Sequence, residues 1–237
     1  MKIIITMSGE GSRFRKKGFN KPKHEIEVNG RSLFEWSMLS LQTFFKEEFI
    51  FIVRKERYNI ENIKISCEKI GIRNWKYIEI EKLTDGQAET VIAASHLLND
   101  DDEIAIYNID TYVKNNSINI KDIKQCYDGF VPAFLAYDDK WSFIKLEGDK
   151  VTEIKEKVKI SDNATVGFYY FKSWKDYLRI YNKYKEEIKS NFKEIYVAPM
   201  YQYLIDEGKY IAGNVIANKN IVPLGTPEDV EVFQKYK

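Results

Sequence analysis

The sequence predicts an α/β fold, a doubly wound, mostly parallel but mixed sheet that is flanked by helices. Unbroken apolar runs stand at residues 3–5, 49–53 and 104–107, and such runs are typical of parallel strands buried on both faces. Helix-like segments separate these runs, which is the alternation that builds a parallel sheet. From about residue 130 onward, strand-like segments follow one another directly, so we expect the sheet to become mixed there.

In the first half, residues with turn or capping chemistry bound the expected elements. Ser32 can cap a helix and Gly71 can end one. Residues 29–30 and 85–86 have the composition of turns. The expected strands are residues 3–5, 25–28, 49–53, 77–80 and 104–107. The expected helices are residues 33–44, 60–70 and 87–98.

The second half is expected to hold several strands in succession and three helices. The strands are residues 130–137, 142–146, 151–155, 165–171 and 221–224. Two helices cover residues 173–189 and 197–207, and the last begins with Thr226 as N-cap and Pro227 as first helical residue. No internal repeat or long linker interrupts the chain, so we expect a single domain, 1–237, with halves at 1–115 and 116–237.

Composition and charge limit the class of protein and of ligand. The chain has 37 Lys and Arg against 36 Asp and Glu, a formal net charge of +1, which argues against a nucleic-acid partner. The basic residues between 13 and 23 therefore point to a local anionic ligand. Cys67 and Cys126 fit a reduced, cytoplasmic protein better than a disulfide scaffold. We see neither a signal peptide nor an apolar run of membrane-spanning length, so no membrane partner is expected.

The loop after the first strand is the strongest candidate for an anion site. Gly9 and Gly11 allow a tight turn whose N–H groups can face one ligand. Arg13 and Lys23 add a guanidinium and an ammonium suited to phosphate oxygens. The loop lacks the Gly-Lys-Ser/Thr ending of a P-loop, and Phe14 stands where a dinucleotide-binding loop has its third glycine. The two cations and the glycine turn thus predict a triphosphate site of another kind.

This loop resembles the signature of the nucleotidyltransferases that activate sugar phosphates and related phosphorylated metabolites. The resemblance rests on Gly-x-Gly-Ser-Arg, eight further residues and then Pro22-Lys23. Further stretches are similar to the family's motifs and occur in the same order. They are residues 27–31, Gly86-Gln87-Ala88, Asn108-Ile109-Asp110, Glu156-Lys157, residues 163–169 and residues 224–229. The likeness therefore covers nearly the whole chain.

The resemblance implies a Rossmann-like, GT-A-like nucleotidyltransferase fold, with a nucleotide-binding half and an acceptor-binding half. It implies that Arg13 and Lys23 are catalytic and that Asp110 binds Mg²⁺. The implied nucleotide-binding residues are Met7, Ser8, Gly9, Glu10, Gly11, Ser12, Arg13, Gly86, Gln87, Ala88 and Asn108. The implied acceptor-binding residues are Glu156, Lys157, Gly167 and Tyr196. Since Glu10 lies between the glycines, its carboxylate is expected to turn away from the phosphates.

The implied reaction joins a nucleoside triphosphate to a phosphorylated small molecule and releases pyrophosphate. The chain's size and the resemblance favour CTP and the small cytidylyltransferase-like members of surface- or capsule-polysaccharide pathways. The acceptor could be a sugar phosphate, phosphocholine or a phosphoglutamine-like molecule, and a homodimer is compatible with the family. The alternatives are a glucose-1-phosphate thymidylyl- or uridylyltransferase, a glycosyltransferase that uses a nucleotide sugar, and an inactive nucleotide-binding regulatory protein.

Two points of the implied site stay open at this stage. Many relatives have a second metal-binding carboxylate where this chain has residues 223–225, Pro-Leu-Gly, which offer no ligating side chain. Asn218, Asn220 or water could take its place. His24, beside the implied catalytic lysine, could touch phosphate or lie exposed in the loop, and we expect the exposed position.

Overall fold

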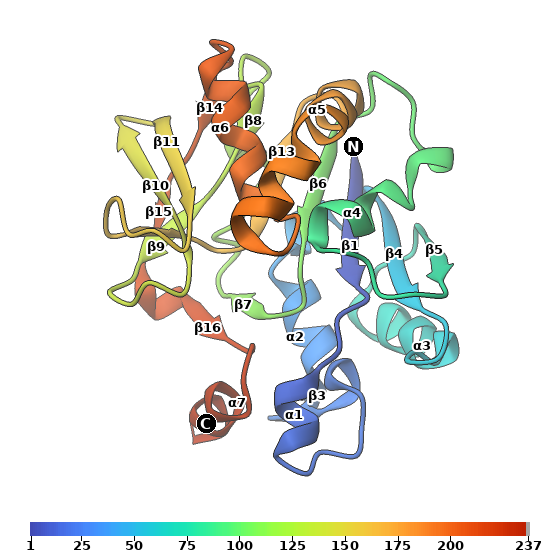
Figure 1. The fold of residues 1–237 in the computed structure, drawn as a ribbon. Helices are drawn as coiled ribbons and strands as arrows, with labels where there is room; N and C mark the ends of the chain where they lie inside the picture. Colours follow the sequence, from blue (N-terminus) through green and yellow to red (C-terminus); the bar gives the residue numbers. More distant parts are fainter. Residues whose placement is uncertain (236–237) are drawn as a thin grey trace.

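A computed structural model describes residues 1–235, so the last two residues of the predicted domain lie outside the described part. A twelve-stranded mixed sheet forms its centre, in the order β15-β9-β12-β10-β11-β14-β8-β13-β6-β1-β4-β5 (Figure 1). Two small two-stranded sheets, β16-β7 and β2-β3, stand apart from it.

The parallel part of the sheet comes from the first half of the chain. Its strands are β1 (Lys2–Met7), β4 (Glu48–Arg54), β5 (Trp75–Ile80) and β6 (Ile104–Tyr107). β1 is parallel to both β4 and β6, and β4 is parallel to β5. The helices of this half are α1 (Ser12–Lys16), α2 (Leu33–Leu39), α3 (Ile60–Ile70) and α4 (Gln87–Ile92). The expected order of strands and helices is confirmed.

Each face of the sheet has its own apolar core. On one face, Ile3 and Ile5 of β1 pack in a core with Phe34 of α2 and Ile63 of α3. On the other face, Ile4 belongs to a core that includes residues of α4, α5 (Trp174–Phe192) and α6 (Ala198–Asp206). Because adjacent strand residues point to opposite faces, both must be apolar when helices cover both faces. The fold class is therefore confirmed as an α/β, Rossmann-like mixed sheet flanked by helices.

The second half adds short, mostly antiparallel strands. They are β8 (Gly129–Phe130), β9 (Ala133–Leu135), β10 (Ser142–Glu147), β11 (Lys150–Glu156), β12 (Asn163–Thr165), β13 (Phe168–Phe171), β14 (Ile211–Ala212) and β15 (Val215–Ile216). The expected strands 130–137 and 165–171 are each split in two. The break after β8 falls at Pro132, which has no N–H for a ladder, and the break before β13 falls at Gly167, whose φ is +82°.

Shorter elements complete the chain. The hairpin of β2 (Glu27–Val28) and β3 (Arg31–Ser32) precedes α2, and β7 (Thr111–Val113) pairs with β16 (Ile221–Pro223). α7 (Pro227–Lys235) is the last helix described. Single 3₁₀ turns are η1 (Lys23–Glu25), η2 (Gln42–Phe44), η3 (Ser95–Leu97), η4 (Ile120–Asp122) and η5 (Asn218–Asn220).

The helix ends show which capping predictions hold. The Ser32 hydroxyl accepts the Glu35 N–H at 3.1 Å, and Gly71 ends α3 with a φ of +93°. The Thr226 hydroxyl accepts the Asp229 N–H at 3.1 Å, so all three predicted caps are confirmed. The expected helices 33–44 and 87–98 end early. In the first, the Ser40 hydroxyl accepts the Val113 N–H at 2.9 Å, which ties this point of the chain to β7.

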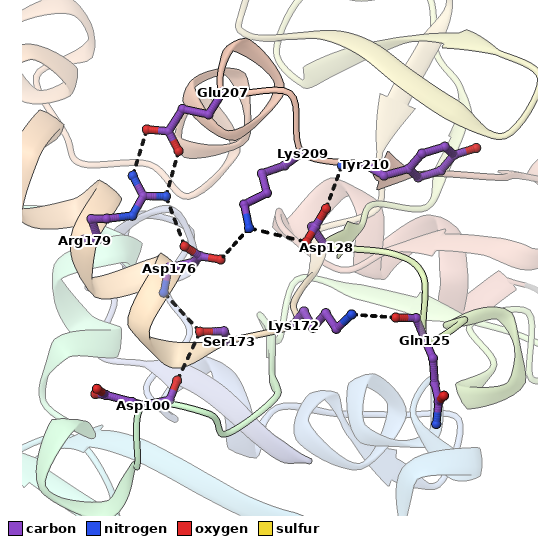
Figure 2. A network of polar contacts seen from close by, with 10 residues as sticks. All are labelled: Asp100, Gln125, Asp128, Lys172, Ser173, Asp176, Arg179, Glu207, Lys209 and Tyr210. Carbon is purple, nitrogen blue, oxygen red and sulfur yellow. Dashed lines mark hydrogen bonds and ion pairs between the residues drawn. The ribbon is translucent and has the colours of Figure 1, made fainter.

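Charged side chains connect α5 and α6 to the sheet (Figure 2). Arg179 of α5 donates two hydrogen bonds to Glu207, each 2.7 Å long. Lys209 lies between Asp176 of α5 and Asp128, with N–O distances of 3.3 and 3.5 Å. This network joins α5 and the end of α6 to the start of β8. Within residues 1–235, no helix is both long and apolar enough to cross a bilayer.

Candidate functional site

A cavity of about 310 Å³ opens at the carboxyl ends of β1 and β6. Ligands of doubly wound sheets bind at this edge of the sheet. The loop after β1 forms one wall, and Asn108 to Asp110, which follow β6, form another. Thr6 and Met7 of β1 also line it, and Lys23, Tyr58 and Gly225 complete the lining, so segments far apart in the sequence meet here.

The glycine loop leads directly into a short helix. Gly11 has a φ of +60°, a conformation that disfavours side chains, and it precedes the first residue of α1. The sequence indicated only a loop here, and α1 is an addition that the structure makes. Of the predicted nucleotide-binding residues, those that line the cavity are Met7, Gly9, Glu10, Gly11, Ser12, Arg13 and Asn108.

Glu10 is surrounded by three guanidinium groups. Its carboxylate accepts hydrogen bonds from Arg54 and Arg15, and Arg57 lies 3.4 Å away. The hydrogen bond from Arg54, followed by that from Arg15, lowers the pKa of Glu10 to about 2. The three arginines therefore neutralise the negative charge that Glu10 places between the two glycines.

Lys23 and Asp110 form an ion pair at the cavity wall. The Lys23 side chain is 12% exposed, and its ammonium lies 5.6 Å from the centre of the Phe14 ring. The backbone of Asp110 is fixed on both sides: its N–H donates to the Asn108 side-chain oxygen at 3.2 Å, and its carbonyl accepts the Leu224 N–H at 2.6 Å. The predicted catalytic lysine and the predicted metal ligand are thus held within direct contact.

His24 is the residue that the sequence analysis placed wrongly. It is 3% exposed and stacks on the Tyr58 ring, with centroids 4.1 Å apart and planes 20° apart. Burial lowers the pKa of His24 to about 4, so the imidazole is neutral near pH 7. Tyr58 in turn lines the cavity. No sequence signal showed this contact, because His24 stands among charged residues and Tyr58 lies 34 positions further on.

The predicted nucleotide-binding turn, Gly86 to Ala88, lies beside the cavity and outside its lining. Gly86 has a φ of +148°, and a Cβ there would lie 2.5 Å from the Ile195 nitrogen. The Ala88 N–H donates to the Ile195 carbonyl at 2.9 Å, and its methyl group is fully buried. The Gln87 side chain donates to the Thr6 hydroxyl at 3.2 Å. Ala88 is therefore a core residue, and any side-chain contact of this turn with a nucleotide would come from Gln87.

Ser8 is also buried and connects the turn to the glycine loop. Its hydroxyl lies 3.1 Å from that of Thr90 in α4. Thr90 also contacts the Thr84 hydroxyl at 2.6 Å and donates to the Gly86 carbonyl at 3.0 Å. The two predicted nucleotide-binding segments are thus joined through hydroxyl groups.

Three of the four predicted acceptor residues form one cluster. The Lys157 ammonium donates to the Tyr196 hydroxyl at 2.5 Å and lies 3.9 Å from a carboxylate oxygen of Glu156. Glu156 is buried and accepts a hydrogen bond from Ser142. Burial raises the pKa of Glu156, and the Ser142 hydrogen bond opposes this shift. The fourth residue, Gly167, lies against Asn108, where a Cβ would come within 2.8 Å of the amide nitrogen.

Of the residues suggested as metal ligands, Asp110 lines the cavity and the two asparagines do not. Within residues 1–235, no group of three or more His, Cys, Asp or Glu side chains is arranged to hold a metal. The side chain of Asn218 binds the backbone of Leu135, and that of Asn220 binds Ser117 and Asn115. Both asparagines are therefore engaged elsewhere, and the suggestion that either supplies the second ligand is not supported.

One exposed carboxylate nevertheless fits Mg²⁺ when the substrate supplies the remaining oxygens. Mg²⁺ is commonly held by one or two carboxylates together with phosphates and water. The donor set at Asp110 thus matches a metal that arrives with a nucleotide.

Comparison with known proteins places this geometry in a family. No family model and no curated protein matches the sequence. Among solved structures, the nucleoside-diphosphate-sugar pyrophosphorylase from Vibrio cholerae RC9 is 34% identical with a TM-score of 0.89, over 98% of this chain and 99% of that one.

Two more distant structures share the fold. The inositol-1-phosphate CTP transferase from T. maritima is 17% identical, with a TM-score of 0.75. The match covers 99% of this chain and 95% of the transferase chain. A UDP-glucose pyrophosphorylase complexed with UDP-glucose is 16% identical, with a TM-score of 0.75. The match covers 100% of this chain and 99% of the pyrophosphorylase chain. The close match over nearly the full length of both chains, together with the glycine loop and the Lys23–Asp110 pair at one cavity, shows that this chain is an enzyme of the sugar-phosphate nucleotidyltransferase family.

Proposed function

We propose that the protein transfers a nucleotidyl group from a pyrimidine nucleoside triphosphate, CTP being favoured, to a phosphorylated sugar or polyol. The observation that carries this proposal is the ion pair of Lys23 and Asp110 on the wall of the cavity that the glycine loop and Arg13 also line. The product would be a nucleoside-diphosphate sugar or polyol, a precursor of capsule or other surface polysaccharide.

The reaction joins two polyanions, so its main demand is charge neutralisation in a fixed geometry. An oxygen of the acceptor phosphate attacks the α-phosphorus of the triphosphate. The bond from the α-phosphorus to the bridging oxygen breaks, and pyrophosphate leaves with its electron pair. We assign Lys23 to the α-phosphate and the attacking phosphate, and Arg13 to the departing β- and γ-phosphates.

Asp110 is the residue proposed to hold Mg²⁺. The metal, when bound, would neutralise phosphate charge and orient the triphosphate. In the structure, the carboxylate of Asp110 is bound by the Lys23 ammonium. A bound nucleotide and its metal would therefore have to separate this pair, which would free Lys23 for the phosphates.

The acceptor cluster favours a hydroxyl-rich acceptor over phosphocholine. A quaternary ammonium group is recognised on the open faces of aromatic rings. Here the Lys157 ammonium lies 4.4 Å from the centre of the Tyr196 ring, so a cation of the protein already occupies the aromatic group of the cluster. Glu156 offers a hydrogen-bond acceptor and Lys157 a hydrogen-bond donor to the hydroxyl groups of a sugar or polyol.

The choice of base rests on the family resemblance. The CTP-using neighbour and the UDP-glucose neighbour have the same TM-score of 0.75, so overall shape does not favour either base. Thymidylyl or uridylyl transfer to a sugar phosphate is the second candidate for this reason.

Pyrophosphate release tests the proposal. The protein is incubated with Mg²⁺, each of the four triphosphates and a panel of phosphorylated sugars, polyols, choline and amino-acid derivatives. We expect release with a pyrimidine triphosphate and a sugar or polyol phosphate, and a product of the mass of the corresponding nucleoside-diphosphate derivative. Release with phosphocholine alone would overturn the acceptor assignment. Triphosphate binding without release from any pair would favour a regulatory protein, and transfer from a finished nucleotide sugar would favour a glycosyltransferase.

A further inference from the structure

Three arginines gather around one carboxylate beside the cavity. We call Arg15, Arg54 and Arg57 the arginine cluster; each pairs with Glu10. Within residues 1–235, no other carboxylate lies within ion-pair distance of these three side chains. Three guanidinium groups against one carboxylate leave an excess of two positive charges next to the glycine loop.

The sheet and a tight turn bring this excess charge to the loop. Met7 of β1 pairs with Val53 of β4, so the next residues, Ser8 and Arg54, leave the parallel strands side by side. The Arg57 N–H then donates to the Arg54 carbonyl at 2.8 Å, closing a turn between the two arginines. The glycine loop thus begins beside Arg54 because of strand register, a relationship that sequence distance conceals.

Arg54 is buried with one of its donors unused. The residue is 7% exposed, one terminal nitrogen donates to Glu10, and the other terminal nitrogen has no hydrogen-bond partner. Leaving a buried charged donor without a partner is costly. Such a donor is explained when a ligand that completes its hydrogen bonds binds nearby.

The cluster also acts on the cavity wall. Glu10 and Tyr58 both line the cavity. Burial raises the pKa of the Tyr58 hydroxyl, the charge of Asp110 raises it further, and Arg54 and Arg57 oppose the shift. Tyr58 therefore lies within electrostatic reach of the arginines on one side and of Asp110 on the other.

We propose that the arginine cluster is a second anion subsite, which takes the pyrophosphate part of the triphosphate, and that Glu10 holds the cluster when no phosphate is bound. Glu10 is then a competing anion of the protein itself: phosphate oxygens replace its carboxylate on entry, and the carboxylate regains the arginines when pyrophosphate leaves. This inference rests on the proposed function, and it adds residues outside the Gly-x-Gly-Ser-Arg and Pro-Lys signature to the leaving-group side.

Binding of inorganic pyrophosphate, with and without Mg²⁺, tests the subsite apart from turnover. Arg57→Gln removes one cation from the surface side of the cluster, and Arg73→Gln is its matched control, an exposed arginine before β5 at the opposite edge of the sheet. Glu10→Gln removes the competing charge, and Glu147→Gln, an exposed carboxylate at the end of β10, is the control for it. Calorimetry gives the pyrophosphate affinity of each variant, and thermal unfolding verifies that each is folded.

We expect Arg57→Gln to weaken pyrophosphate binding about tenfold or more, as loss of a hydrogen bond to a charged group does. Glu10→Gln should strengthen the binding and slow turnover through slower pyrophosphate release. Equal affinities of Arg57→Gln and Arg73→Gln would overturn the subsite, and weaker binding by Glu10→Gln would overturn the competing role of Glu10. Failure of the wild-type protein to release pyrophosphate from any substrate pair would instead count against the proposed function.

Discussion

Lys23 and Asp110 stand 87 positions apart in the sequence and form a direct ion pair at the cavity. Lys23 belongs to the turn η1, and Asp110 follows β6 at the carboxyl edge of the sheet. The side chain of Asp110 is 52% exposed, whereas that of Lys23 is largely covered. The two residues to which we assign phosphate and metal binding therefore neutralise each other in the structure, and our proposal requires a substrate to separate them.

Replacing Lys23 should stop turnover without unfolding the protein. We expect Lys23→Ala to lower kcat about 100- to 1,000-fold, since a preorganised group at the reacting phosphate is lost. Its partner Asp110 stays solvated, so the unfolding temperature should change little. Pyrophosphate release and thermal unfolding measure the two effects. Lys21→Ala, an exposed lysine of the same loop, is the control, and near-normal activity of Lys23→Ala would remove Lys23 from the mechanism.

Asp110→Asn should change the requirement for metal. We expect the Mg²⁺ concentration for half-maximal turnover to rise about tenfold or more, because a neutral amide replaces the carboxylate. A chelator should abolish wild-type turnover. Titration of Mg²⁺ against pyrophosphate release measures the change, and Asp139→Asn, an exposed carboxylate in another loop, serves for comparison. An unchanged Mg²⁺ dependence would mean that the metal binds elsewhere.

His24 should make the fold less stable in mild acid. Burial lowers its pKa to about 4 in the folded protein, whereas an unperturbed imidazole has a pKa of about 6.5. The unfolded chain therefore binds more protons between these values. The contribution of His24 is complete above about pH 6.5 and is lost as the pH falls toward 4, by about 3 kcal/mol at most.

The two histidines of the chain supply both the variant and its control. His24→Phe keeps a ring against Tyr58 and removes the titrating group, so it should flatten this part of the stability profile. His96→Phe changes an exposed histidine and should leave the profile as it is. Denaturant unfolding at pH 7 and at pH 4.5 gives the free energies. A wild-type slope retained in His24→Phe would assign the pH dependence to other groups.

Gly86→Ala should damage both the turn and the nucleotide site. The new methyl group would lie 2.5 Å from the backbone nitrogen of Ile195, in addition to the strain of a φ of +148°. We expect a loss of about 3 kcal/mol or more in the free energy of unfolding, together with a higher KM for the triphosphate. In Gly148→Ala, with a φ of +65° and no atom within 4 Å, strain acts alone, and a loss of about 1 kcal/mol is expected. Equal losses of unfolding free energy in the two variants would show that the backbone at Ile195 can move away from the new methyl group at little energetic cost.

Part of the fold could be predicted because its signals are local. The apolar runs around Ile4, Phe51 and Ile106 identified three parallel strands, since residues buried on both faces must all be apolar. Ser32 and Gly71 fixed helix ends, because caps depend on the chemistry of one residue and its near neighbours. The splitting of two strands was missed, although Pro132 and Gly167 stood in the sequence.

The sequence by itself determined the order of the main strands and helices, though not α1, β7, β14 or β15, and it determined the glycine loop and the residue types of the predicted phosphate site. Only the tertiary structure decided that His24 lies buried against Tyr58, that Ala88 belongs to the core and that Glu10 is held by Arg15, Arg54 and Arg57. The physical reason is that propensity and patterning act over a few residues. The charges and rings that meet at the carboxyl edge of the sheet are brought there by strand register and by turns that join distant parts of the chain.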